Sequence, residues 1–320
     1  MIKSVRKIIY TVVEDVMGSC RRPLYTRVLA EEFVENILGY RDRYDSVVTH
    51  IVENENTLTR FERYPTLSYE DYRIGRYRTQ EQRLVLQEKI LGELINFKRL
   101  DNDDDIRLGR GGAKPENTIK NSQAYIVTGP PASGKSSIAT RLADETGSYI
   151  IDSDYAKRKI PEYKSNGGAS LVHEESDSIV FNPENGLFVY CLYNKFNIVI
   201  PLVGKTQKSV ERITNKLVSF GYSIHIVNVC LDRYKCAIRA CKRFEATKRY
   251  VPLSYIFDEV GNEPERIYFL LKRKYATHQS FTSFSQISTD VRRGQPNVVL
   301  EVNGASPILS WKDYLWQKEG

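Results

Sequence analysis

The segment GPPASGKS spans residues 129–136 and matches in full the pattern G-x-x-x-x-G-K-[S/T], in which a glycine-rich loop binds phosphate. The run AYIVT at residues 124–128 predicts a strand before the loop, and residues 136–146 predict a helix after it. The pattern requires this order of strand, loop and helix. The segment therefore predicts a P-loop α/β fold whose ligand is a nucleotide such as ATP.

Pro130 and Pro131 have no N–H group, so the donors to phosphate must be the backbone amides from Ala132 to Ser136. The N-terminus of the following helix adds its positive end. Lys135 is expected to reach the β- and γ-phosphates of ATP, and the Ser136 hydroxyl is expected to hold Mg²⁺. The predicted ATP-binding residues are Gly129, Ala132, Ser133, Gly134, Lys135, Ser136 and Ser137.

The rest of the chain divides by its hydrophobic pattern. The first hundred residues read as helical, whereas short apolar runs alternate with helical stretches from residue 122 onward, which indicates parallel strands joined by crossover helices. We predict a doubly wound, mainly parallel α/β sheet of P-loop kinase type with an N-terminal helical extension. Strands are expected at residues 124–128, 149–151, 197–203, 223–231 and 298–302. The expected parts are a helical region at 1–104, a P-loop kinase domain at 105–305 and a helical tail at 306–320.

The composition indicates the charge of the ligand and the cellular compartment of the protein. The formal net charge of +7 suits an anionic ligand, either a nucleotide or a nucleic acid, and charge alone does not separate the two. No run of about 18 apolar residues occurs, so we expect no membrane span. Glu14 and Asp15 end the short N-terminal apolar run, which argues against a signal peptide. The five cysteines fit neither a disulfide framework nor a zinc site, as is typical of a reducing cytoplasm.

Two carboxylates, Asp152 and Asp154, follow the second expected strand. Ligands of open α/β sheets bind at the carboxyl ends of the strands, so both side chains are expected beside the γ-phosphate. One can accept the proton of an attacking hydroxyl, and the other can help hold Mg²⁺ through water. The alternative for Asp152 is an N-cap of the next helix. A nucleotide-binding switch protein without an acceptor would need a water-positioning group here instead.

The residues around this acidic pair carry a family resemblance. DSDYAKRKIPEY at 152–163, VHEES at 172–176 and TKRYVP at 247–252 resemble segments of the zeta-toxin family of P-loop kinases, over roughly residues 105–305. The resemblance implies an ATP- and Mg²⁺-dependent kinase that phosphorylates a hydroxyl of a nucleotide-linked small molecule. It also implies a toxin with an antitoxin partner.

The same resemblance assigns roles to single residues. It makes Asp154 the general base and places Arg243 and Arg249 as cations near the triphosphate. The other acid, Asp152, is then a candidate for contact with both Mg²⁺ and the substrate. Further substrate contacts are expected from Lys157, Tyr163, His173, Glu174, Glu175 and Lys205. A solvated helix start is the alternative for His173, Glu174 and Glu175. A helix face of solvated charges is the alternative for Arg243 and Arg249.

One departure bears on the acceptor. Family members phosphorylate UDP-N-acetylglucosamine, and a related bacterial effector phosphorylates NAD. Residues 201–205 read PLVGK where the UDP-sugar kinases carry Glu-Gly-Thr-Gly-Arg, so an acid and a hydroxyl are missing. This loss of polar groups favours NAD slightly over UDP-N-acetylglucosamine. A polynucleotide kinase with the same site is the alternative, and it would need a basic groove that admits a strand.

Overall fold

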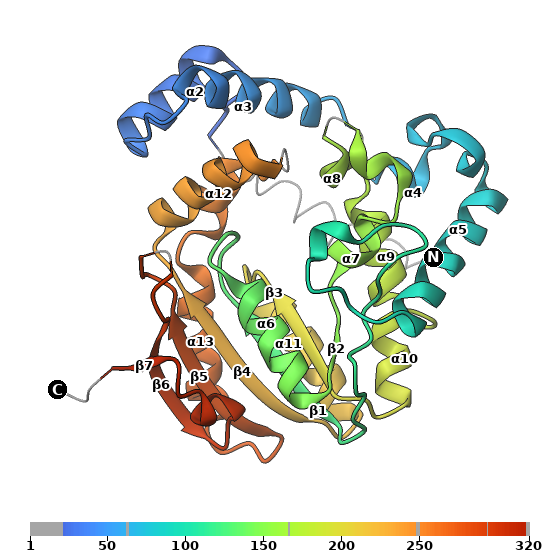
Figure 1. The fold of residues 1–320 in the computed structure, drawn as a ribbon, viewed down its shortest axis with the longest axis vertical. Helices are drawn as coiled ribbons and strands as arrows, with labels where there is room; N and C mark the ends of the chain where they lie inside the picture. Colours follow the sequence, from blue (N-terminus) through green and yellow to red (C-terminus); the bar gives the residue numbers. More distant parts are fainter. Residues whose placement is uncertain (1–21, 62–63, 166, 248–249, 293, 318–320) are drawn as a thin grey trace, which may run out of the picture.

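The computed structural model describes residues 22–61, 64–165, 167–247, 250–292 and 294–317. The strands are β1 (Gln123–Thr128), β2 (Tyr149–Ile150), β3 (Ile198–Leu202), β4 (Ser223–Cys230), β5 (Phe281–Ser288), β6 (Val298–Gly304) and β7 (Leu315–Trp316). They form one sheet in the order β2-β3-β1-β4-β5-β6-β7 (Figure 1). All neighbours pair in parallel except β5 and β6. The predicted mainly parallel α/β sheet is confirmed.

Helices cover both faces of this sheet. α6 (Lys135–Thr146) lies on one face, and α11 (Gln207–Ser219) and α13 (Glu263–Tyr275) lie on the other (Figure 1). We call the side of the phosphate loop that carries Asp152 and Asp154 the acidic side. Its helices are α7 (Ser153–Lys157), η5 (Pro161–Lys164), α8 (Gly168–Leu171), α9 (His173–Phe181) and α10 (Leu187–Tyr193). On the opposite side lie α12 (Arg233–Thr247) and η6 (Tyr255–Val260). None of the helices in the described ranges is both long and apolar enough to span a membrane.

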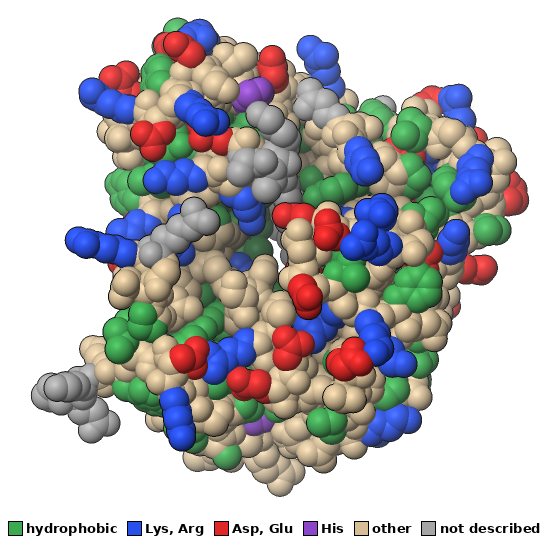
Figure 2. All heavy atoms as spheres, viewed as in Figure 1, with side chains coloured by type: hydrophobic (Ala, Val, Ile, Leu, Met, Phe, Trp, Pro, Cys, Tyr) green, Lys and Arg blue, Asp and Glu red, His purple; other side chains and the backbone are tan. Residues whose placement is uncertain are grey.

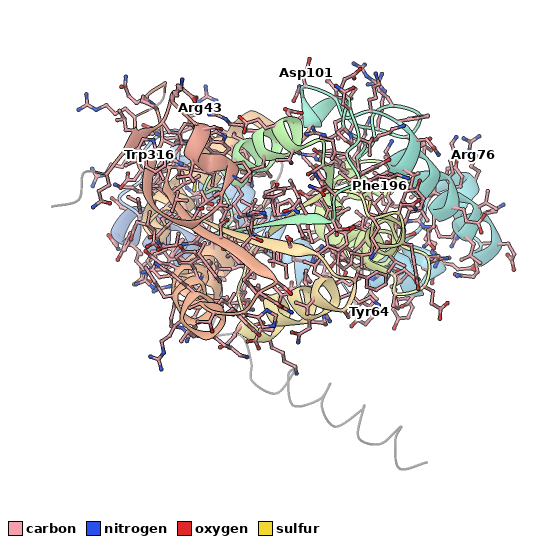
Figure 3. All side chains as sticks on the ribbon, turned by 90° about the horizontal axis from the view of Figure 1, so that it is seen from below. Arg43, Tyr64, Arg76, Asp101, Phe196 and Trp316 are labelled. Carbon is pink, nitrogen blue, oxygen red and sulfur yellow. The ribbon has the colours of Figure 1, made fainter. Side chains whose placement is uncertain are left out.

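The N-terminal region is helical, as predicted, over the part that the structure describes. Its helices are α2 (Arg27–Glu32), η1 (Phe33–Ile37), α3 (Tyr44–Leu58), α4 (Pro65–Ser68), η2 (Glu70–Tyr72), η3 (Gly75–Tyr77), α5 (Gln80–Asn96) and η4 (Asp103–Asp105). Figure 3 shows Arg76 of η3 and Trp316 of β7 at opposite sides of the molecule.

These N-terminal helices share two hydrophobic cores with the P-loop domain. Leu86, Ile90 and Leu94 of α5 are fully buried in the core that surrounds the sheet. A second core joins α2, η1 and α3 to α12 and η6, where the rings of Phe33 and Phe257 meet edge-on with centroids 5.6 Å apart. Burial of this apolar surface stabilises the packing of the N-terminal helices on the P-loop domain.

Two elements near the C-terminus differ from the sequence expectations. The sequence does not predict β5, because its pattern FTSFSQIS is rich in polar residues, yet Ser283 and Ser285 are buried inside the sheet. The tail at 306–320 is expected to be helical. Its described part instead contains a single 3-10 turn, η7 (Pro307–Ser310), and the strand β7. The backbone of β7 pairs with β6, which satisfies hydrogen bonds that a helix would otherwise make internally.

A buried ion-pair cluster fixes α5 against the acidic side of the site. The Arg83 guanidinium is fully buried and donates to both oxygens of Glu162 and of Glu175, at distances between 2.6 and 3.0 Å. Gln87 donates a further hydrogen bond of 2.7 Å to Glu175. These bonds satisfy two carboxylates that would be very costly to bury alone.

Replacing Arg83 with methionine is expected to lower the free energy of unfolding by about 3–5 kcal/mol, because two carboxylates would stay buried without their cation. Equilibrium urea unfolding measures this change. Arg78→Ala is the matched control: Arg78 pairs with Asp71 on the surface, and its loss should cost less than about 1 kcal/mol. Equal losses in the two variants would show that the buried cluster does not hold α5 in place.

Candidate active site

The phosphate loop runs from the end of β1 to the start of α6. A Cβ atom on Gly129 would lie 2.5 Å from the carbonyl oxygen of Val229 in β4, so only glycine fits this position. Gly134 is the N-cap of α6 and has a φ of 94°, in the region that favours glycine. Ala132 also has a positive φ, of 63°. Turns of this kind aim successive amides at an anion, as phosphate binding requires.

The Lys135 side chain folds over the mouth of the loop. Its ammonium donates to the carbonyl oxygens of Gly129 and Pro130, both at 2.7 Å. Burial lowers the pKa of Lys135 to about 8. Ser136 and Ser137 lie in the first turn of α6 with exposed side chains. The predicted ATP-binding residues therefore form one continuous loop and helix start.

The lowered pKa of Lys135 gives a testable prediction. A free enzyme at pH 8 would carry this side chain about half protonated, and a bound triphosphate would raise its pKa again. We therefore expect ATP binding at pH 8 to take up about half a proton more in the wild type than in Lys135→Ala. Calorimetry in two buffers of different ionisation enthalpy measures the uptake. Equal uptake by the two proteins at pH 8 would contradict this assignment.

A second layer of residues supports the loop from the side of β5. Thr289, just after β5, donates from its hydroxyl to the carbonyl oxygen of Ser133 at 2.6 Å. Arg239 of α12 donates in turn to the Thr289 carbonyl oxygen at 2.7 Å. No local motif marks Thr289 in the sequence, so its contact with the loop is not predicted from the sequence. Its position at the carboxyl end of a strand could have indicated a role near the loop. That strand, β5, is itself not predicted from the sequence.

The two acids have different surroundings. Asp152 is the N-cap of α7, and its Oδ1 accepts from the Asp154 amide at 2.9 Å, so the capping alternative holds. Burial, followed by the neighbouring charge of Asp154, raises the pKa of Asp152 to about 6. Asp154 forms an ion pair of 3.0 Å with Lys157. The charges of both acids reach Lys135 and raise its pKa against the effect of burial.

The predicted substrate residues do not all share one place. Lys157 lies 3.3 Å from Nδ1 of His173, which joins these two residues to Asp154. Glu174 is half-buried at the start of α9. Glu175 is instead 1% exposed and held by Arg83, so we do not retain it as a substrate contact.

Lys205 and Arg243 belong to the opposite side of the loop, where α12 and η6 lie. Lys205, after β3, pairs with Glu259 of η6 and lies 5.4 Å from the centre of the Tyr255 ring. The positive charge of Arg243 in α12 acts on Lys135 and lowers its pKa further. Arg249 lies outside the described residues. Figure 2 shows a hollow in the surface at the centre of the view, between the acidic side of the loop and the side that carries α12.

The residues present fit a Mg²⁺ ion bound mainly by phosphate and water. No group of three or more potential protein ligands occurs among the described residues. Magnesium in kinase sites typically has one or two protein ligands, and substrate phosphates and water supply the others. The exposed Ser136 hydroxyl and the half-buried Asp152 carboxylate suit that arrangement.

Comparison with known proteins identifies the family. The family model for Zeta toxin matches residues 111–287, more than half of the 320 residues. The chain belongs to the zeta toxin family. This match confirms the predicted resemblance. Zeta toxins are ATP-using phosphotransferases. A search of curated proteins found no match to this zeta toxin family member.

Solved structures were also compared with this zeta toxin family member. The PezAT chromosomal toxin–antitoxin system of the human pathogen Streptococcus pneumoniae aligns with a TM-score of 0.45 and 15% identity, over 72% of this chain and 85% of that chain. The native AvrRxo1-ORF1:-ORF2 complex aligns with a TM-score of 0.45 and 13% identity, over 72% of both chains. The AvrRxo1-ORF1:-ORF2 structure with ATP aligns with a TM-score of 0.40 and 11% identity, over 85% of this chain and 70% of that chain.

Proposed function

We propose that this zeta toxin family protein transfers the γ-phosphate of ATP to a hydroxyl of a nucleotide-linked small molecule, with Mg²⁺, and acts as a toxin. The position of Asp154 carries the proposal. Its carboxylate is 26% exposed, is held by Lys157 and acts electrostatically on the phosphate-loop lysine. A base that is accessible to an acceptor and lies beside the phosphate loop is what phosphoryl transfer to an alcohol requires.

In the proposed mechanism, the loop amides and Lys135 bind the β- and γ-phosphates. Asp154 accepts the proton of the acceptor hydroxyl while its oxygen attacks the γ-phosphorus, and ADP leaves with the bridging oxygen. Arg243 and Arg249 neutralise the charge that spreads over the equatorial oxygens. Mg²⁺, when bound, neutralises phosphate charge; Ser136 would hold it directly, and Asp152 through water.

For the acceptor we propose NAD ahead of UDP-N-acetylglucosamine. The side chains of Pro201 and Val203 offer neither donors nor acceptors where UDP-sugar kinases carry polar groups. Lys205 is engaged by the Glu259 carboxylate and the Tyr255 ring. A phosphate of the substrate would have to compete with that carboxylate. For the partner we propose an antitoxin protein, as membership of this family implies. For the compartment we propose the cytoplasm, because the cysteines fit no disulfide framework.

The test is to incubate the full chain with γ-labelled ATP, Mg²⁺ and either NAD, UDP-N-acetylglucosamine or a 5′-hydroxyl oligonucleotide. Mass spectrometry and phosphorus NMR then locate any new phosphate. Phosphorylated NAD is the expected product. Transfer to UDP-N-acetylglucosamine alone would reverse the order of acceptors. Transfer only to the oligonucleotide would replace the proposal with a polynucleotide kinase, and ATP binding without transfer to any acceptor would favour a switch protein.

A further inference from the structure

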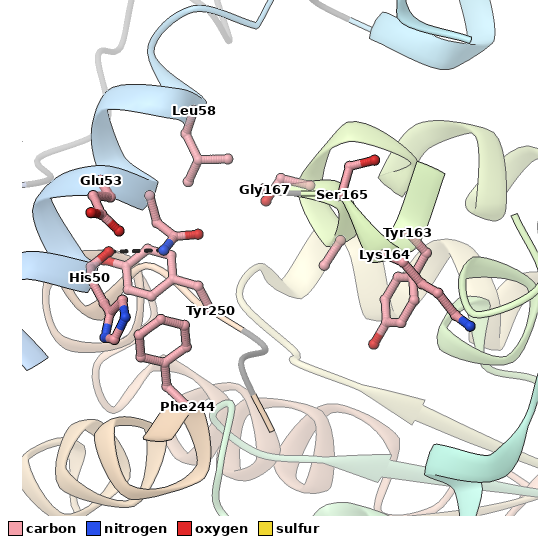
Figure 4. Close-up of a pocket in the computed structure, with 13 residues that line it drawn as sticks. His50, Glu53, Leu58, Tyr163, Lys164, Ser165, Gly167, Phe244 and Tyr250 are labelled. Atoms are coloured by element: carbon pink, nitrogen blue, oxygen red, sulfur yellow. Dashed lines mark hydrogen bonds between the residues drawn. The ribbon is translucent and has the colours of Figure 1, made fainter. Parts of the chain in front are cut away.

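A cavity of about 480 Å³ opens between the N-terminal helix α3 and the acidic side of the active site. Figure 4 shows His50, Glu53, Phe244 and Tyr250 on one wall, and Tyr163, Ser165 and Gly167 on the other. The cavity size falls in the range of about 300–1,000 Å³ that is typical of small-molecule sites. Its lining residues are His50, Glu53, Asn54, Leu58, Tyr163, Lys164, Ser165, Gly167, Gly168, Ala169, Ser170, Phe244 and Tyr250.

One wall of the cavity is aromatic and held rigidly. The rings of Phe244 and Tyr250 meet edge-on with centroids 5.4 Å apart, and His50 meets Phe244 in the same way at 5.4 Å. The Tyr250 hydroxyl donates to the buried Glu55 carboxylate at 2.6 Å. Aromatic side chains fixed in this way offer flat and edge contacts to a planar ring of a ligand.

The same wall carries a directional polar group. Asn54 is 7% exposed, and its amide nitrogen donates to the His50 carbonyl oxygen at 2.8 Å. Within the part of the chain that the structure describes, the Asn54 Oδ1 has no hydrogen-bond partner. That oxygen can accept from the ring N–H or exocyclic amine of a heteroaromatic base. A hydrogen-bonding oxygen beside aromatic rings suits a nucleobase better than a purely apolar ligand.

The cavity adjoins the acceptor side of the reaction centre. Tyr163 and Lys164 belong to η5, a few residues after α7, which carries Asp154. Phe244 follows Arg243, whose charge acts on Lys135. No residue of the phosphate loop lines the cavity. The cavity is therefore lined by η5, which follows the helix of the proposed base along the chain, and it is separate from the loop that would bind the triphosphate.

We infer that this cavity binds the nucleobase of the acceptor and that α3 forms its outer wall. The inference rests on the proposed kinase function and adds to it the chemical class of the acceptor group and residues of the N-terminal region. These residues lie outside the part of the chain that the family model matches, 111–287. The specificity for the acceptor is thus supplied partly by α3, whereas the phosphate chemistry is supplied by the P-loop domain.

Two variants and one control test this inference with the full chain. Ala169→Phe places a ring in the cavity and should raise the KM for the acceptor at least about 30-fold, with ATP affinity within about twofold of the wild type. Asn54→Leu removes the oxygen and should raise that KM about tenfold with little change in kcat. Thr49→Leu, an exposed position of the same helix, should change neither. An unchanged acceptor KM in both folded cavity variants would overturn the inference, and so would an equal loss of ATP affinity.

A binding measurement separates this inference from the proposed function. AMP and UMP are titrated by calorimetry into wild type and Ala169→Phe, with the ATP site saturated by a non-hydrolysable ATP analogue. Nucleotide binding that is present in wild type and lost in Ala169→Phe supports the cavity as a nucleobase site, even if no phosphate transfer occurs. Identical titrations of the two proteins, including no binding to either, would overturn it.

Discussion

Lys135→Ala is expected to reduce phosphoryl transfer by at least about 10³-fold, to the background rate. The wild-type ammonium sits at the mouth of the loop, 2.7 Å from two loop carbonyl oxygens, where the β- and γ-phosphates would bind. Alanine removes the cation that would neutralise these phosphates, both in the bound state and during transfer. Transfer from labelled ATP under saturating acceptor, together with ATP affinity from calorimetry, measures both effects.

The control for this variant is Lys312→Ala, which removes one positive charge from an exposed position far along the chain. It should leave turnover and ATP affinity unchanged. Circular dichroism and thermal unfolding establish that Lys135→Ala is folded. Near-normal turnover in a folded Lys135→Ala protein would show that the phosphate loop is not the site of transfer.

Asp154→Asn is expected to cut turnover by about 10²-fold or more and to leave ATP binding nearly intact. The amide has nearly the shape of the carboxylate but cannot accept the proton of the acceptor hydroxyl. In the structure the Asp154 carboxylate forms an ion pair of 3.0 Å with the Lys157 ammonium. This ion pair positions the carboxylate for proton transfer. Single-turnover transfer measured by rapid quench separates the chemical step from binding.

Asp152→Asn is the matched comparison, two residues away. Asparagine caps a helix about as well as aspartate, so α7 should stay folded. The expected effect is a higher Mg²⁺ requirement with a smaller loss of maximal turnover, because one carboxylate near the ion is lost. If Asp152→Asn removed turnover and Asp154→Asn did not, the roles of base and Mg²⁺ ligand would have to be exchanged.

The sequence predicts the β-α-β surroundings of the loop because they depend on short-range features. The segment at 129–136 carries glycines where the backbone needs a positive φ, and a buried strand precedes it. The position of Asp152 and Asp154 at the end of β2 follows from the same logic. β5 could not be predicted in this way, because a strand inside a sheet can be polar when its neighbours satisfy it.

The chain by itself determined the fold class, the phosphate loop and the pair of acids, because each is specified by residues close together along the chain. Only the tertiary structure decided which distant residues meet. Arg83 forms a buried ion pair with Glu175, 92 positions away. Thr289 donates a hydrogen bond to the loop residue Ser133, 156 positions away. The N-terminal α3 likewise encloses a cavity together with η5 and α8. Such contacts form because folding buries apolar surface and pairs buried charges throughout the whole domain, and no local pattern encodes that balance.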